Sequence, residues 1–187
     1  SDTIFGKKIG ILGYGHIGKS IVDLLQGFNL KFYILKKQPL LNKKNIFFSS
    51  LDKILASCDV IFICLPLTNL TSKIINKNNS HLLKETTYLV NIARAELIDE
   101  VVLHDLIKHN KIAGAALDVW YNEGSKIFNK KLSSNFNFTN LDNILYSPHR
   151  AGYILNKCHN LEDVTNNLIN YYKNKKISNI VNINKAY

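Results

Sequence analysis

The sequence predicts an α/β fold, a doubly wound parallel sheet with helices on both faces. Short apolar segments rich in branched residues alternate along the chain with segments whose apolar residues recur at helical spacing. The segment 59–65 (DVIFICL) is apolar almost throughout, as expected for a strand covered on both faces. Ligands of such sheets bind outside the carboxyl ends of the strands. Functional side chains are therefore expected directly after Leu12, Leu35, Leu65, Ile92, Leu117 and Ser147.

The elements follow one another in the order that a parallel sheet requires. Each predicted strand is a short run of apolar, branched or aromatic residues, and glycine bounds the first. These strands are expected at 8–12, 31–35, 45–48, 59–65, 88–92, 112–119 and 143–147. Apolar residues three and four positions apart predict helices at 17–28, 51–55, 99–109 and 161–171, and a short extended tail at 180–183 comes last.

Composition bounds the class of protein. The 187 residues are 46% apolar and 20% charged, enough for one sizeable domain with a packed core. The longest apolar run, 60–67, is far shorter than the about 20 residues that span a bilayer, so no membrane-spanning segment is expected. The three cysteines are widely spaced and form no CxxC pair, which favours a reducing cytoplasm over a disulfide framework or zinc site. His104 and His109 are five positions apart, not the four that would place two ligands on one face of a helix, so no metal site is expected either.

The charge of +10 invites a nucleic-acid interpretation, but the kind of basic residue argues against it. Only Arg94 and Arg150 are arginines, and the other 22 basic residues are scattered lysines. Arginine is the residue that clamps phosphates and reads bases bidentately. A solvated basic surface is therefore expected, and no nucleic-acid partner.

A glycine-rich turn, GYGHIG, stands between the first strand and the first helix. Gly13 permits the tight turn, Gly15 lets the backbone approach a pyrophosphate, and Gly18 lets helix and strand pack closely. The helix start offers unpaired N–H groups to the anion. Binding of a dinucleotide is favoured over a purely structural glycine turn.

The residue that would contact the adenosine ribose is expected about 20 residues further on, at the end of the second strand. Lys36 and Lys37 stand there, and no acidic residue is near. Lysines suit a 2′-phosphate, so NADP is favoured over NAD as the cofactor. The alternative is that both lysines belong to the general lysine surplus.

Three polar residues of complementary chemistry follow strand ends: Arg94, Glu123 and His149. The imidazole can give a proton to a carbonyl oxygen as a hydride reaches its carbon, and a carboxylate on the other ring nitrogen would fix the tautomer. A guanidinium would bind a substrate carboxylate. These are the candidate catalytic residues.

Five stretches in order resemble the NAD(P)-binding domain of the D-isomer-specific 2-hydroxyacid dehydrogenases, a Rossmann-type fold, over nearly the whole chain. They are 6–18, 59–71, 89–100, 112–120 with YNEG after it, and 147–153. The resemblance implies hydride transfer between a nicotinamide cofactor and a small 2-oxo or 2-hydroxy acid, in a homodimer. It assigns Arg94 to substrate binding, Glu123 and His149 to catalysis, and the cofactor to His16, Ile17, Leu65, Pro66, Thr71, Ile92, Ala93, Asp118 and Gly152. The sequence departs from the family at Ala95, usually Gly, and at Gly124, usually Pro.

The same resemblance implies a two-domain protein. Residues 1–152 are expected to form the dinucleotide-binding domain, and 153–187 to return toward a substrate domain whose N-terminal part is missing here. The piece alone is expected to bind cofactor and to reduce substrate poorly. Two alternatives stay open: a cofactor-sensing or corepressor-like scaffold on the same fold, and a methyltransferase, which gives no reason for the three catalytic candidates.

Overall fold

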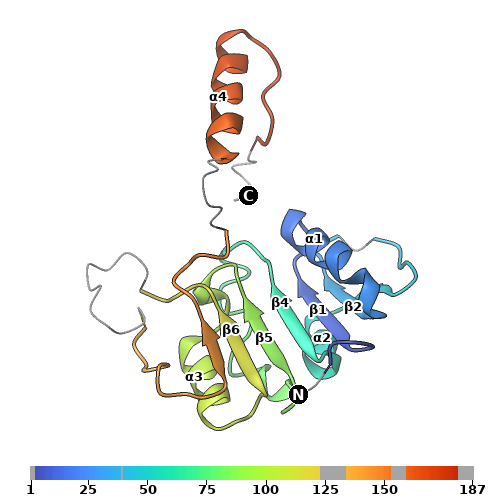
Figure 1. Cartoon of the computed structure of the whole chain (residues 1–187), viewed down its shortest axis with the longest axis vertical. Coiled ribbons are helices and arrows are strands. Elements are labelled where there is room, and N and C mark those ends of the chain that lie inside the picture. The colour runs from blue at the N-terminus through green and yellow to red at the C-terminus, as the bar shows by residue number, and fades with distance from the viewer. Residues whose placement is uncertain (1–2, 39, 123–133, 153–158, 181–187) are drawn as a thin grey trace. The chain divides into compact units, whose positions relative to one another are not determined.

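A computed structural model describes residues 3–38, 40–122, 134–152 and 159–180, with the side chains of 159 and 160 left aside. The chain divides into two compact units, 1–151 and 152–187, which are considered separately. The first holds a seven-stranded, all-parallel sheet in the order β3-β2-β1-β4-β5-β6-β7 (Figure 1). The predicted doubly wound parallel fold is confirmed. The strands are β1 Lys8–Leu12, β2 Lys31–Leu35, β3 Ile46–Phe48, β4 Val60–Ile63, β5 Tyr88–Asn91, β6 Gly114–Leu117 and β7 Ile144–Tyr146.

The four α-helices of the described residues lie where the sequence predicts them. The α-helices are α1 His16–Leu25, α2 Leu51–Ser57, α3 Glu100–Lys108 and α4 His159–Tyr172, and short 3₁₀ turns lie at Gln26–Phe28, Ser80–Leu82 and Ala95–Leu97. The first predicted helix is too long, because the chain tightens into a 3₁₀ turn after Leu25 and leaves it at Asn29 in the left-handed conformation (φ 53°). The predicted tail at 180–183 lies outside the described residues except for its first position.

The helix starts differ in how their free N–H groups are satisfied. The Asp99 carboxylate caps α3 by accepting from Val101 and Val102, and the Ser50 hydroxyl accepts from Lys53 at the start of α2. The start of α1 has Gly15 at the capping position, with no side-chain hydrogen bond and no acidic residue in its first turn. Of the three α-helix starts described in this unit, only that of α1 lacks a side-chain cap for its N–H groups.

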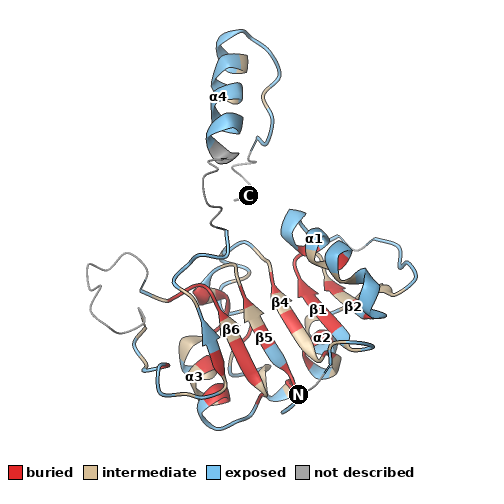
Figure 2. Ribbon diagram, viewed as in Figure 1, coloured by how far each residue is buried: buried red, intermediate tan, exposed pale blue. Residues whose placement is uncertain are grey.

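The two faces of the sheet are covered unequally. Helices α2 and α3 cover one face, where Ile61 and Leu89 are completely buried. On the other face α1 buries Ile9 and Ile11, but further across the sheet Tyr88 of β5 is 49% exposed and Leu145 of β7 is 75% exposed. Figure 2 shows that buried residues are concentrated in the central strands, whereas most of α1 is exposed. The expectation that strand 59–65 is covered on both faces holds only in part, because Val60 and Phe62, which point to the second face, pack against the cluster around Ile9 and Ile11 but stay half-buried.

The topology fixes where a ligand can lie. The chain runs outward from β1 to β2 and β3, then returns to place β4 on the other side of β1. The order therefore reverses between β1 and β4, and the crevice outside their carboxyl ends is the binding position in open α/β sheets. Gly13 follows β1 and Cys64 follows β4 at this point. No helix among the described residues is long and apolar enough to cross a bilayer.

Candidate functional site

The turn after β1 is compressed between its two neighbouring strands. Gly13 has φ +102°, and a Cβ there would lie 2.8 Å from the Cys64 carbonyl oxygen. Its N–H donates to the Leu35 carbonyl at the end of β2 (3.1 Å). Both the positive φ and the close approach require glycine. The turn therefore lies at the meeting point of β2, β1 and β4.

The third glycine of the motif joins helix to strand. A Cβ on Gly18 would overlap the Gly13 carbonyl oxygen and lie 3.1 Å from Cγ2 of Ile11. Gly18 is buried in the first turns of α1, which can therefore pack directly on β1. The absence of a side chain here sets the distance between the helix and the sheet.

The second glycine faces solvent. No atom lies within 4 Å of a Cβ built on Gly15, and His16 and Ile17 after it are exposed. This open position and the uncapped start of α1 suit the close approach of a diphosphate to backbone N–H groups. The described residues thus fit a dinucleotide, whose pyrophosphate would lie next to Gly15, His16 and Ile17.

The residues assigned to the adenosine side lie on two loops at this edge. Lys36 is half-buried and Lys37 exposed, directly after β2, and no acidic residue occurs between Asp23 and Asp52. Thr71 closes the loop after β4, since its hydroxyl donates to the Pro66 carbonyl (2.6 Å) and accepts from the Thr68 N–H (2.8 Å).

The Thr71 hydroxyl is therefore engaged within its own loop. Leu65 is half-buried and Pro66 exposed at the start of that loop. Thr71 shapes the wall that Leu65 and Pro66 form.

A buried asparagine shapes the loop that carries Arg94. Asn91 ends β5 and is 1% exposed. Its amide donates to the Arg94 carbonyl (2.9 Å) and accepts from the Ala93 N–H (3.1 Å). Arg94 is exposed, and its guanidinium donates to the Ala93 carbonyl (2.6 Å). Sequence reasoning missed Asn91, although a polar residue ending the apolar run YLVN was the available signal.

The loop that carries His149 is tied to a buried carboxylate. Asp118 follows β6 and accepts hydrogen bonds from the Ser147 hydroxyl and from the N–H groups of Arg150 (2.7 Å) and Ala151 (2.8 Å). The His149 N–H donates to the Asp118 carbonyl (2.9 Å). Burial alone would raise the pKa of Asp118, but these hydrogen bonds and the nearby His149 outweigh it, so its pKa lies below the ordinary value. Sequence reasoning missed Ser147.

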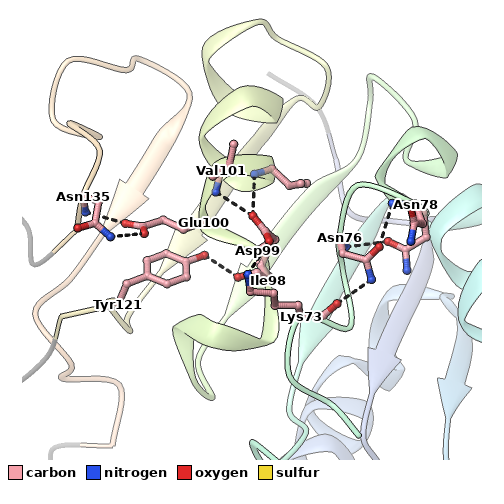
Figure 3. A network of polar contacts seen from close by, with 11 residues as sticks. Lys73, Asn76, Asn78, Ile98, Asp99, Glu100, Val101, Tyr121 and Asn135 are labelled. Carbon is pink, nitrogen blue, oxygen red and sulfur yellow. Dashed lines mark hydrogen bonds and ion pairs between the residues drawn. The ribbon is translucent and has the colours of Figure 1, made fainter. Parts of the chain in front are cut away.

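Glu123 lies outside the described residues, but the chain on either side of 123–133 is anchored to one place (Figure 3). The Tyr121 hydroxyl donates to the Ile98 carbonyl (2.9 Å). The Glu100 carboxylate accepts from the Asn135 N–H and side-chain amide, both at 2.7 Å. Burial first, with nearby carboxylates, raises the pKa of Tyr121. Residues 98–100 thus bind the chain both before and after the segment 123–133.

The two described candidate catalytic residues come from strands on either side of β6. Arg94 follows β5 and His149 follows β7, and β6 with Asp118 lies between these strands. The structure joins Asp118 to the His149 loop directly, whereas a meeting of His149 and Arg94 with Glu123 stays a prediction. Gly152 is exposed in the turn that follows. Among the described residues no three His, Cys, Asp or Glu side chains group as metal ligands do.

A comparison with known proteins shows the family of the chain. Residues 1–151 match the sequence model of the D-isomer specific 2-hydroxyacid dehydrogenase, NAD binding domain. The chain belongs to this family.

The relatives of this domain are named as enzymes with different substrates. A D-lactate dehydrogenase of Lactiplantibacillus plantarum is 33% identical over 168 residues, which are 85% of this chain and 50% of that protein. A glyoxylate reductase of Thermococcus kodakarensis is 35% identical over 149 residues, 78% of this chain and 42% of that protein. An acyclic imino acid reductase (Bsp5), solved with NADPH and D-Arg, is 27% identical with a TM-score of 0.80, over 95% of this chain and 55% of its own. The chain thus spans about half the length of these relatives.

Proposed function

We propose that this chain is the cofactor domain of an NAD(P)-dependent oxidoreductase that interconverts small 2-oxo and 2-hydroxy acids. The observation that carries the proposal is the glycine turn at the switch point of the sheet, where Gly15 is open and α1 begins uncapped. Family membership supports the reaction class. The sensor or scaffold alternative keeps the same cofactor site, and only turnover separates it from an enzyme.

Each candidate residue has one task in this reaction. The bound nicotinamide supplies or accepts the hydride. The Arg94 guanidinium binds the substrate carboxylate, and the His149 imidazole gives a proton to the carbonyl oxygen or takes it from the hydroxyl. Glu123 would hold the other ring nitrogen of His149. Asp118 would lie beside the nicotinamide carboxamide, and Ile92 and Ala93 beside the nicotinamide ribose, as the family resemblance implies.

We propose NADP as the preferred cofactor, because Lys36 and Lys37 follow β2 and no acidic residue lies near. Titration of NADH and NADPH into wild type and Lys36→Asp tests it. Wild type should bind NADPH at least about tenfold more tightly, which is about 1.4 kcal/mol, and Lys36→Asp should lose this preference. Lys108→Asp is the control for net charge. Lys108 ends α3, which leads into the amino end of β6, whereas Lys36 follows the carboxyl end of β2. Equal affinities for both cofactors in wild type and Lys36→Asp would refute the 2′-phosphate contact.

Turnover is tested with the full-length protein, since the chain spans about half of its relatives. NADPH or NADH oxidation is followed by absorbance with glyoxylate, hydroxypyruvate and pyruvate as substrates. Oxidation with one of them, abolished in His149→Ala, supports the enzyme. Cofactor binding without turnover of any 2-oxo acid would favour the sensor.

We also propose a homodimer in the cytoplasm. The cysteines of the described residues, Cys58 and Cys64, are free thiols, and burial raises the pKa of each to about 11, which disfavours the thiolate form. A reducing compartment suits such thiols. Sedimentation of the full-length protein and fractionation of its cells test the two statements, and a monomer or a secreted protein would refute them.

A further inference from the structure

We infer that Ser147 and Asp118 form a clamp that positions His149 for proton transfer, a role that rests on the proposed function. The clamp is defined as the Asp118 carboxylate with its three donors, the Ser147 hydroxyl and the N–H groups of Arg150 and Ala151. Ser147 is thereby a positioning residue.

Asp118 binds three consecutive N–H groups of one loop, two through the clamp and one through its main-chain carbonyl. The Arg150 N–H is 2.7 Å from Oδ1 of Asp118 and the Ala151 N–H is 2.8 Å from Oδ2. The His149 N–H donates to the main-chain carbonyl of the same aspartate at 2.9 Å. Asp118 is 5% exposed, whereas 148–151 are exposed, so a buried group organises a surface loop.

His149 needs such support because of its backbone. Its φ of 55° lies in the left-handed region, which a residue with a Cβ occupies only at a cost in free energy. Strain of this kind persists where surrounding contacts hold it. The bonds to Asp118 on residues 149, 150 and 151 supply that constraint and fix the direction in which the His149 side chain leaves the main chain.

The donors also explain why the group is a carboxylate. Both oxygens of Asp118 accept from N–H or O–H groups, and an asparagine would turn an NH₂ toward one of them. The Ser147 carbonyl in turn accepts from Nε1 of Trp120 (3.0 Å), so the serine is fixed on a buried side chain. The clamp therefore rests on a buried side chain as well as on the loop.

Amide hydrogen exchange of the 187-residue chain, read by NMR, tests the clamp without turnover. In Asp118→Asn at least one of the Arg150 and Ala151 amides should exchange about 10- to 100-fold faster, because the asparagine keeps an acceptor oxygen for only one of them and the lost hydrogen bond was to a charged group. In Ser147→Ala the His149 ring resonances should shift, and Ser147→Thr, which keeps the hydroxyl, should restore them. Ser57→Ala removes a hydroxyl that caps a carbonyl of α2 and is the matched control. Unchanged amide exchange in Asp118→Asn, or unmoved ring resonances in Ser147→Ala, would overturn the clamp.

Kinetics of the full-length protein test the positioning role. Ser147→Ala should lower kcat at least about tenfold with the KM for cofactor unchanged, because the lost interaction acts on the transition state, and Ser147→Thr should recover it. Unchanged kcat in Ser147→Ala would overturn the role. If wild type turns over no 2-oxo acid, the proposed function fails, and amide exchange and ring resonances still decide the clamp.

Discussion

Substitution of Gly18 by alanine should destabilise the protein although it adds a good helix former to α1. The added Cβ would overlap the Gly13 carbonyl oxygen and press on Ile11. A main-chain oxygen cannot rotate away as a side chain can, so α1 must shift on β1. The perturbation is therefore local, and its cost can be worked out from the packing.

Overpacking of this kind costs about 2–3 kcal/mol where the neighbour cannot yield. Alanine returns about 1 kcal/mol of helix propensity relative to glycine. The net loss of unfolding free energy in Gly18→Ala is then about 1–2 kcal/mol. For a chain of this length that corresponds to a fall in Tm of about 2–8 °C.

Gly15→Ala is the matched control, because no atom lies within 4 Å of its Cβ and its φ of −83° is accessible to alanine. It should leave stability unchanged or raise it by up to about 1 kcal/mol, through the less flexible unfolded chain. Its Cβ would occupy the approach of the pyrophosphate, so the Kd for NADPH should rise at least about tenfold. Thermal unfolding and cofactor titration of both variants give the comparison. A Gly18→Ala protein as stable as wild type, or Gly15→Ala with unchanged cofactor affinity, would refute the assignment of the glycines.

Three further outcomes are expected in denaturant unfolding. Tyr121→Phe should lose about 1–2 kcal/mol, because the Ile98 carbonyl loses its donor, and an unchanged midpoint would contradict that. Asp99→Ala should lose about 1 kcal/mol as a helix cap, and Asp99→Ser should recover most of it. Burial would raise the pKa of Asp59, but the Lys84 ammonium (2.5 Å) and a main-chain N–H outweigh burial and lower the pKa. The contribution of Asp59 to the free energy of unfolding is therefore complete above the unfolded pKa of about 3.9 and is lost as pH falls through the folded pKa. In Asp59→Asn the free energy of unfolding should therefore fall less steeply at acid pH than in wild type. The same acid dependence in both proteins would exclude this ion pair.

Much of the fold follows from local patterns. A parallel strand that is buried on at least one face must be apolar, and a helix that packs on it must repeat its apolar residues every three or four positions. Strand 31–35 was predicted to the residue, and strand 88–92 to within one. The predicted end of the first helix was wrong, because the chain tightens into a 3₁₀ turn after Leu25 that apolar spacing does not reveal.

The candidate site was only partly accessible in the same way. The glycine turn has a signature of spacing, and Lys36 stands where a strand end predicts a ribose contact. Asn91 and Ser147 have none, since each acts by hydrogen bonds on a loop that the sequence does not show to be close. Glu123 remains a prediction.

The sequence by itself determined the strand and helix segments, the glycine turn and the residue types at the strand ends, because periodicity and turn chemistry are local properties. Only the tertiary structure decided that Asp118 binds the His149 loop, since its partners lie 29 to 33 positions away along the chain. Pairing of β6 with β7 brings them together, and that pairing depends on the packing of the whole sheet. The same packing decided that α1 covers only part of its face and leaves Leu145 exposed, which no local pattern records.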